Sequence, residues 1–98
     1  MKQRDLMCRR LVKKFENAYE EKKHIIIICE NNDYSSTVET DELVVIEDGG
    51  NIVFDNMEGL NFTIKRNNIN MISLSDISDS EEVNIDFGKS NIKLLICN

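Results

Sequence analysis

Four consecutive isoleucines, in the stretch His24-Ile25-Ile26-Ile27-Ile28-Cys29, decide how this chain folds. Successive side chains of a strand point to opposite faces, so an unbroken apolar run predicts a strand that is covered on both faces. We therefore expect this strand to begin a sheet and to lie in its interior. The polar residues 31–33 end it, because asparagine and aspartate side chains favour turns.

The segment before this strand, residues 4–22, has the pattern of an amphipathic helix. Its apolar residues recur at intervals of three and four, which places them in one stripe. The stripe consists of Leu6, Met7, Leu11, Val12, Phe15, Ala18 and Tyr19. Lys22 and Lys23 end the segment, where cations interact favourably with the carbonyl end of a helix. We predict that the stripe is a core face.

Short apolar segments separated by turn residues fill the rest of the chain. Turns are predicted at residues 48–51, 57–59 and 88–90, where glycine and aspartate tolerate a positive φ. Strands are predicted over residues 37–47, 52–56, 60–65, 83–87 and 92–96. Residues 69–74 form either a strand after a bulge or one helical turn. Residues 75–80 are predicted to be a polar, acidic loop.

These elements predict a single α+β domain over residues 1–98. An N-terminal amphipathic helix at about 4–22 is followed by an antiparallel meander of five or six strands at about 24–97. An open sheet with the helix on one face and a sheet curled into a small barrel both fit the pattern.

Several strands carry apolar residues on their second face as well. One helix cannot cover both faces of a sheet, so the spare face must close on itself or meet a partner. We therefore predict self-association, most simply as a homodimer, through Val44, Ile46, Val53, Met57 and Leu95.

The net charge of −6 is divided unevenly along the chain. Residues 1–24 carry eight Lys/Arg and four Asp/Glu, a net +4, whereas residues 25–98 carry four and fourteen, a net −10. An acidic surface repels phosphates, so direct nucleic-acid binding through the sheet is disfavoured and a protein partner with a basic surface is favoured. The residues predicted to meet that partner are Glu39, Asp41, Glu42, Asp48, Asp55, Glu58, Asp76, Asp79, Glu81 and Glu82.

The sequence contains few of the groups that catalysis requires. Its single histidine, His24, follows a lysine pair at the predicted helix–strand junction, and no pattern marks a nucleophile beside it. The three cysteines, Cys8, Cys29 and Cys97, are too scattered for a zinc site and indicate reduced thiols in a cytoplasmic protein. We predict neither an enzyme nor a metal or cofactor site.

No apolar run approaches the roughly 20 residues that span a bilayer, and no signal peptide is recognisable, so no membrane partner is expected. The order of one helix and then five strands resembles the Sm-like fold. Phe54-Asp55-Asn56-Met57-Glu58-Gly59-Leu60-Asn61 is similar to that family's first motif, but the glycine pattern before the motif is absent and we assign no family.

Taken together, these features favour a small, acidic, non-catalytic binding module that acts as an inhibitor or adaptor by protein–protein contact. In size and charge the chain resembles phage and mobile-element proteins that block basic, nucleic-acid-binding host proteins such as defence nucleases. The alternatives are a structural homo-oligomer, in which the apolar face is the interface, and a small barrel that binds RNA or a small ligand.

Overall fold

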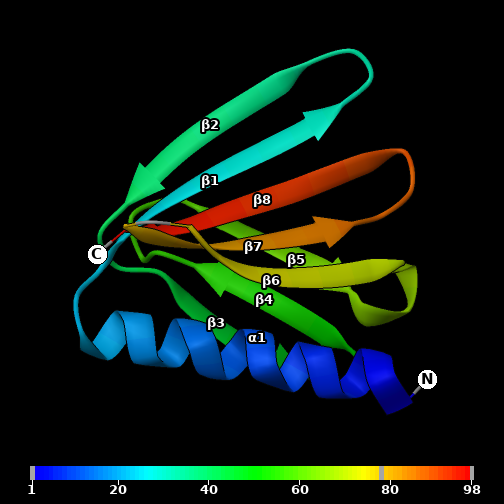
Figure 1. Ribbon diagram of the computed structural model, residues 1–98, viewed down its shortest axis with the longest axis horizontal. Coiled ribbons are helices and arrows are strands. Elements are labelled where there is room, and N and C mark those ends of the chain that lie inside the picture. Colours follow the sequence, from blue (N-terminus) through cyan, green and yellow to red (C-terminus); the bar gives the residue numbers. More distant parts are fainter. Residues whose placement is uncertain (1, 78, 98) are drawn as a thin grey trace.

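The described residues form one α-helix, one short 3-10 helix and eight strands in two antiparallel sheets (Figure 1). A computed structural model describes residues 2–77 and 79–97, with side chains from Asp5 onward. The elements are α1 (Lys2–Glu20), β1 (His24–Asn31), β2 (Ser35–Thr40), β3 (Val44–Asp48), β4 (Asn51–Asp55), β5 (Asn61–Lys65), η1 (Arg66–Asn68), β6 (Met71–Ile77), β7 (Ser80–Asp86) and β8 (Ser90–Cys97). The predicted α+β class is confirmed.

The larger sheet brings the first and last strands of the chain together. Its order is β2-β1-β8-β7-β6, and the order of the smaller sheet is β3-β4-β5. Strand β8 is central because it pairs with both β1 and β7, so that Leu94 lies between Ile27 and Val83. Neither sheet closes into a barrel.

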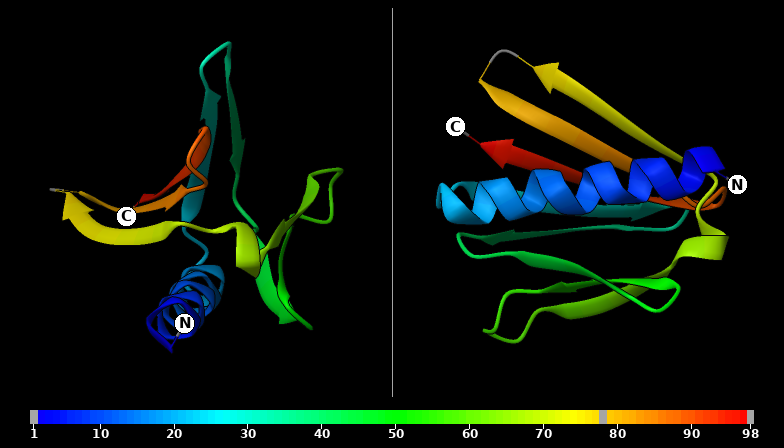
Figure 2. Two further views of the ribbon diagram at one scale, coloured as in Figure 1. Left: turned by 90° about the vertical axis from the view of Figure 1, so that its right-hand side faces the viewer. Right: turned by 90° about the horizontal axis from the view of Figure 1, so that it is seen from below.

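The core lies between the inner faces of the two sheets, and α1 runs along one side of it (Figure 2). Its aromatic centre joins three elements. Phe15 of α1 meets Phe54 of β4 edge-on, with ring centroids 6.4 Å apart, and Phe54 stacks on Phe62 of β5 at 4.6 Å. The buried apolar residues are Cys8, Leu11, Phe15, Ala18, Ile25, Ile27, Leu43, Val45, Ile52, Phe54, Ile64, Ile69, Ile72, Val83, Ile85, Leu94 and Ile96.

The helix uses most of its predicted stripe as a core face, but Leu6 and Tyr19 are about half exposed. It ends two residues earlier than predicted. The Lys22 amide donates to the Tyr19 carbonyl at 3.1 Å and the Lys23 amide to the Ala18 carbonyl at 3.0 Å. With Lys22 at φ 55°, this is a Schellman motif, which stops the helix and turns the chain into β1.

Two predicted boundaries are wrong. The single strand at 37–47 is divided between the two sheets, because Asp41–Leu43 carries the chain across and buries Leu43 in the core. The predicted loop at 75–80 is mostly strand: Ser75 pairs with Glu82 and Asp76 with Glu81. Ser78 lies outside the described residues. At 66–68 the chain makes one helical turn before β6.

Strand β1 is an interior strand, as predicted, but only its inner face is covered. Ile25 and Ile27 are buried, whereas Ile26 and Ile28 are half-buried on the opposite face. No other described element packs over that outer face in Figure 1 or Figure 2. Within the part of the chain described here, no helix is long and apolar enough to cross a membrane.

Phe15→Ala is expected to lower the free energy of unfolding by about 3–5 kcal/mol, because it leaves a cavity against Phe54. Leu6→Ala, at a side chain 48% exposed on the same helix, is the control and should cost much less. Urea denaturation of both variants gives the two values. Equal losses at the two positions would contradict the placement of Phe15 in the core.

Candidate functional site: the acidic end of the sandwich

The strand topology gathers most of the predicted acidic residues at one end of the molecule. Antiparallel pairing places the C-termini of β2, β4, β6 and β8 and the C-terminus of α1 at this end, on the left in Figure 1. We call it the acidic end; it comprises Glu39, Asp41, Glu42, Asp55, Glu58, Asp76, Asp79, Glu81 and Glu82. Asp48 is not part of it, because it lies in the β3–β4 hairpin at the opposite end of β4.

His24 lies between two of these carboxylates. Its Nδ1 is 2.6 Å from Asp41 Oδ1 and its Nε2 is 2.7 Å from Glu39 Oε1. Both nitrogens can donate only in the imidazolium form. The hydrogen bonds that His24 donates to Glu39 and to Asp41, in that order of importance, raise its pKa above the ordinary value of 6.5. A protonated His24 leaves a net charge of −1 on this group of three.

A buried polar contact fixes the neighbouring loops. Asn56 Nδ2 donates to Thr40 Oγ1 at 3.4 Å, which joins the end of β2 to the β4–β5 turn. Asn56 Oδ1 accepts from the amides of Glu58 and Leu60, both at 2.9 Å, and Thr40 Oγ1 accepts from the amide of Glu42 at 3.3 Å. The same contact therefore positions the backbone of two acidic residues from different loops.

The β6–β7 hairpin supplies the remaining carboxylates, and one of them is neutralised. Glu81 accepts from Lys14 of α1 and lies 4.0 Å from Lys23 Nζ. The basic helix and the acidic sheet therefore attract each other locally. In the described part of the chain, six acidic-end carboxylates have no cationic side chain within 4.0 Å: those of Glu42, Asp55, Glu58, Asp76, Asp79 and Glu82.

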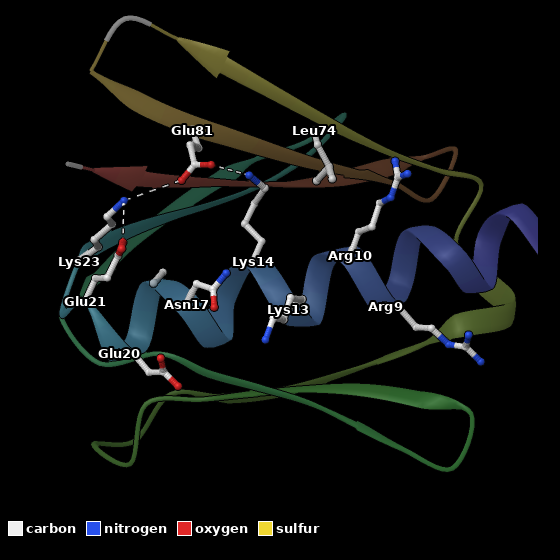
Figure 3. A pocket seen from close by; sticks show the side chains of 11 residues that line it. Arg9, Arg10, Lys13, Lys14, Asn17, Glu20, Glu21, Lys23, Leu74 and Glu81 are labelled. Atoms are coloured by element: carbon white, nitrogen blue, oxygen red, sulfur yellow. Dashed lines mark hydrogen bonds and ion pairs between the residues drawn. The ribbon is translucent and has the colours of Figure 1, made fainter.

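A basic groove of about 630 Å³ lies between α1 and the β6–β7 hairpin (Figure 3). Figure 3 shows Arg10 and Lys14 directed towards the hairpin, whereas Arg9 and Lys13 point away from it. Glu81 already binds Lys14 within the groove. Lys13 and Lys23 are paired as well, with Glu16 and Glu21. Because the cations diverge and three of them are paired, the groove offers no convergent site for an external anion.

The residues predicted to mediate self-association do not form one surface. Val44, Ile46 and Val53 share the outer face of the three-stranded sheet, where Ile46 pairs with Val53. Met57 lies in the β4–β5 turn, and Leu95 lies on the other sheet. Self-association stays a prediction. The sequence pattern placed Val44, Ile46, Val53 and Leu95 on the second face of a strand, but it was wrong for Met57 and could not tell that two sheets share the others.

The described residues contain no group of three His, Cys, Asp or Glu side chains placed to hold a metal ion. Cys8 is buried, Cys29 and Cys97 are half-buried, and no disulfide joins them. Burial raises the pKa of the Cys29 thiol, which disfavours the reactive thiolate.

Comparison with known proteins identifies one protein of similar fold and no family. No protein-family model matches the chain, and no curated protein sequence matches it. The fold is similar to that of ChuX. The crystal structure of ChuX superposes with a TM-score of 0.64 at 12% identity, over 90% of this chain and 58% of the ChuX chain. The chain thus spans less than two thirds of ChuX, and at this identity the likeness concerns the fold alone.

The paired His24 should make stability depend on pH. Because its folded-state pKa is raised, the stabilisation it provides is fully present below about pH 6.5, the ordinary value, and is lost as the pH rises through the folded pKa. His24→Asn should therefore destabilise the protein more at pH 6 than at pH 9. Urea denaturation of both proteins across this range measures the difference, and a pH-independent difference would contradict the paired imidazolium.

Asn56→Ala should lower the free energy of unfolding by about 1–3 kcal/mol, because it leaves two part-buried loop amides without their acceptor and removes the buried hydrogen bond to Thr40. Asn61→Ala, at an exposed position beside the same turn, is the matched control. Similar stability of the two variants in urea would show that the contact between Asn56 and Thr40 does not hold the loops.

Proposed function

We propose that this chain is a small, non-catalytic binding module that presents its acidic end to a basic surface of a protein partner. The observation that carries the proposal is the gathering of nine acidic residues at one end of the sandwich, six of them without a cationic partner in the described structure. Like charges at one end of a molecule repel one another, and a basic partner would relieve that repulsion.

The location of these carboxylates supports rapid association. They lie in turns and at strand ends, and exposed charges act over about 10 Å at 0.1 M salt. A concentrated negative field steers a basic partner towards the acidic end and raises the association rate more than the final affinity. An inhibitor or adaptor acting in the cytoplasm on a basic nucleic-acid-binding protein, including one encoded by a phage or mobile element, fits this chemistry.

The surroundings of His24 support a role without catalysis. A general base needs an unprotonated nitrogen, and both ring nitrogens of His24 face carboxylates that favour the imidazolium. We therefore propose no hydrolase, transferase or redox activity that depends on His24. Turnover abolished by His24→Ala in a folded protein would refute this part of the proposal.

The proposal is tested by two triple variants that change the net charge equally. Glu42→Gln/Glu58→Gln/Asp76→Asn removes three exposed charges from the acidic end, and Glu16→Gln/Asp33→Asn/Asp48→Asn removes three exposed charges elsewhere. The probe is a fluorescein-labelled octa-arginine peptide followed by stopped-flow fluorescence at low salt. The acidic-end variant should associate about tenfold more slowly than the control variant, with a smaller change in dissociation.

Affinity capture from cells of the source organism applies the same pair of variants to the natural partner. A partner should be retained by the unmodified chain and the control variant, and lost with the acidic-end variant in low-salt buffer. If the two triple variants behave alike in both experiments, the carboxylates contribute only net charge and the proposal fails.

A further inference from the structure

The outer face of the five-stranded sheet is uncovered and carries an apolar stripe. Ile26 and Ile28 of β1 and Leu95 of β8 are half-buried there, and Ile26 pairs directly with Leu95. These are interior strands, so the stripe lies in the middle of the face rather than at an edge. Apolar residues at the centre of an uncovered face mark an interaction surface more often than scattered ones do.

The sheet is bent at this face. Seen nearly along the strands in the left view of Figure 2, β1 and β2 stand at a steep angle to β6 and β7, and the angle opens on the side away from α1. At the end distant from the acidic end, a hollow of about 460 Å³ is lined by outer-face residues that include Asn84 and Asn91. The hollow lies next to the apolar stripe on the same face of β8, because Asn91, Lys93 and Leu95 follow each other on that face. We call the whole face the trough.

Carboxylates stand on both sides of the trough. Glu39 of β2 lies on one side, Glu82 and Asp86 of β7 lie on the other, and Glu30 follows Ile28 along β1 at the polar hollow. Measured along the sheet, β2 and β7 are three strand spacings of about 4.8 Å apart, roughly 14 Å, and the bend brings them closer together. The sides of the trough are therefore acidic and its floor is partly apolar, which matches the charged and apolar sides of a basic amphipathic helix.

Three cations also belong to this face, and Lys89 is the one that lines the polar hollow. His24 is on the same face, but Glu39 and Asp41 already neutralise it. Lys93 lies on the floor opposite Ile28 and has no carboxylate within 4.0 Å in the described structure. It separates the apolar half of the floor from the polar hollow, and it limits the apolar contact to the half formed around Ile26 and Leu95.

We propose that the trough binds a basic amphipathic helix of the protein partner, an inference that rests on the proposed function. The apolar side of the helix would lie on Ile26, Ile28 and Leu95, and its lysine or arginine residues would flank the acidic sides. A second copy of this chain fits less well, because the face keeps a net negative charge after Lys89, Lys93 and the protonated His24 are counted, and two such faces repel. The trough opens onto the acidic end through Glu39 and Glu82, so one basic partner could contact both.

The probe is the synthetic peptide LKKLLKLLKKLLKL, labelled with fluorescein, whose leucines and lysines occupy opposite sides of a helix. Binding by anisotropy is compared for the unmodified chain, Leu95→Lys in the trough and Ile46→Lys on the outer face of the other sheet. Leu95→Lys should weaken binding at least tenfold, and Ile46→Lys should change it little. Lys93→Met should strengthen binding several-fold, because it removes a repulsive cation and extends the apolar floor.

Methyl NMR spectra of the unmodified chain provide a readout that does not depend on any variant folding. Titration with the same peptide should shift the methyl signals of Ile26, Ile28 and Leu95, whereas those of Val44 and Ile46 should stay in place. Shifts confined to other residues, or equal effects of the two lysine substitutions, would overturn the trough proposal. Shifts of the trough methyl signals on dilution without peptide would assign the trough to a second copy instead and would also overturn it.

The proposed function and the trough inference can be refuted independently. If the trough variants bind the peptide normally while the acidic-end triple variant still slows octa-arginine association, the trough inference is wrong and the proposed function stands. If the acidic-end variant matches its control while Leu95→Lys abolishes peptide binding, the acidic end is not the contact surface.

Discussion

The edge-on contact of Phe15 with Phe54 is the packing constraint on which the rest of the structure depends. It holds α1 against the three-stranded sheet, and the stacking of Phe54 on Phe62 extends the contact across that sheet. With α1 in this position, the buried faces of both sheets and of the helix contribute to one common core. The face of the larger sheet on the far side from α1 is then left without a covering element, and the strand ends meet beside the helix C-terminus.

Much of the fold could be predicted from local patterns. The helical stripe, the isoleucine run and the glycine-containing turns each depend on neighbouring residues, so periodicity and turn chemistry find them. The crossing between sheets at Asp41–Leu43 could not be found in this way. Val38 and Val44 both fit one continuous strand, and only the pairing of β1 with β8, far apart in sequence, leaves β2 and β3 in different sheets.

The acidic residues were recognisable from the sequence as a set, but not as a surface. These residues converge because of the antiparallel register and the buried contact between Asn56 and Thr40. Neither of these can be predicted from the amino-acid composition. The charge of Glu81 was counted as available, although Lys14 and Lys23 bind it. The second-face apolar residues were predicted correctly except for Met57, which lies in a turn, and their division between two sheets changes which of them can act together.

The central claim is that topology concentrates unneutralised negative charge at one end of the molecule. The most direct measurement compares amide relaxation caused by a cationic and an anionic soluble nitroxide, which reports the electrostatic potential near each residue. We expect the cationic probe to be strongly enriched around residues 39–42, 55–58 and 79–82, compared with 30–34 and 48–51. A similar ratio of the two probes at both ends of the molecule would contradict the account.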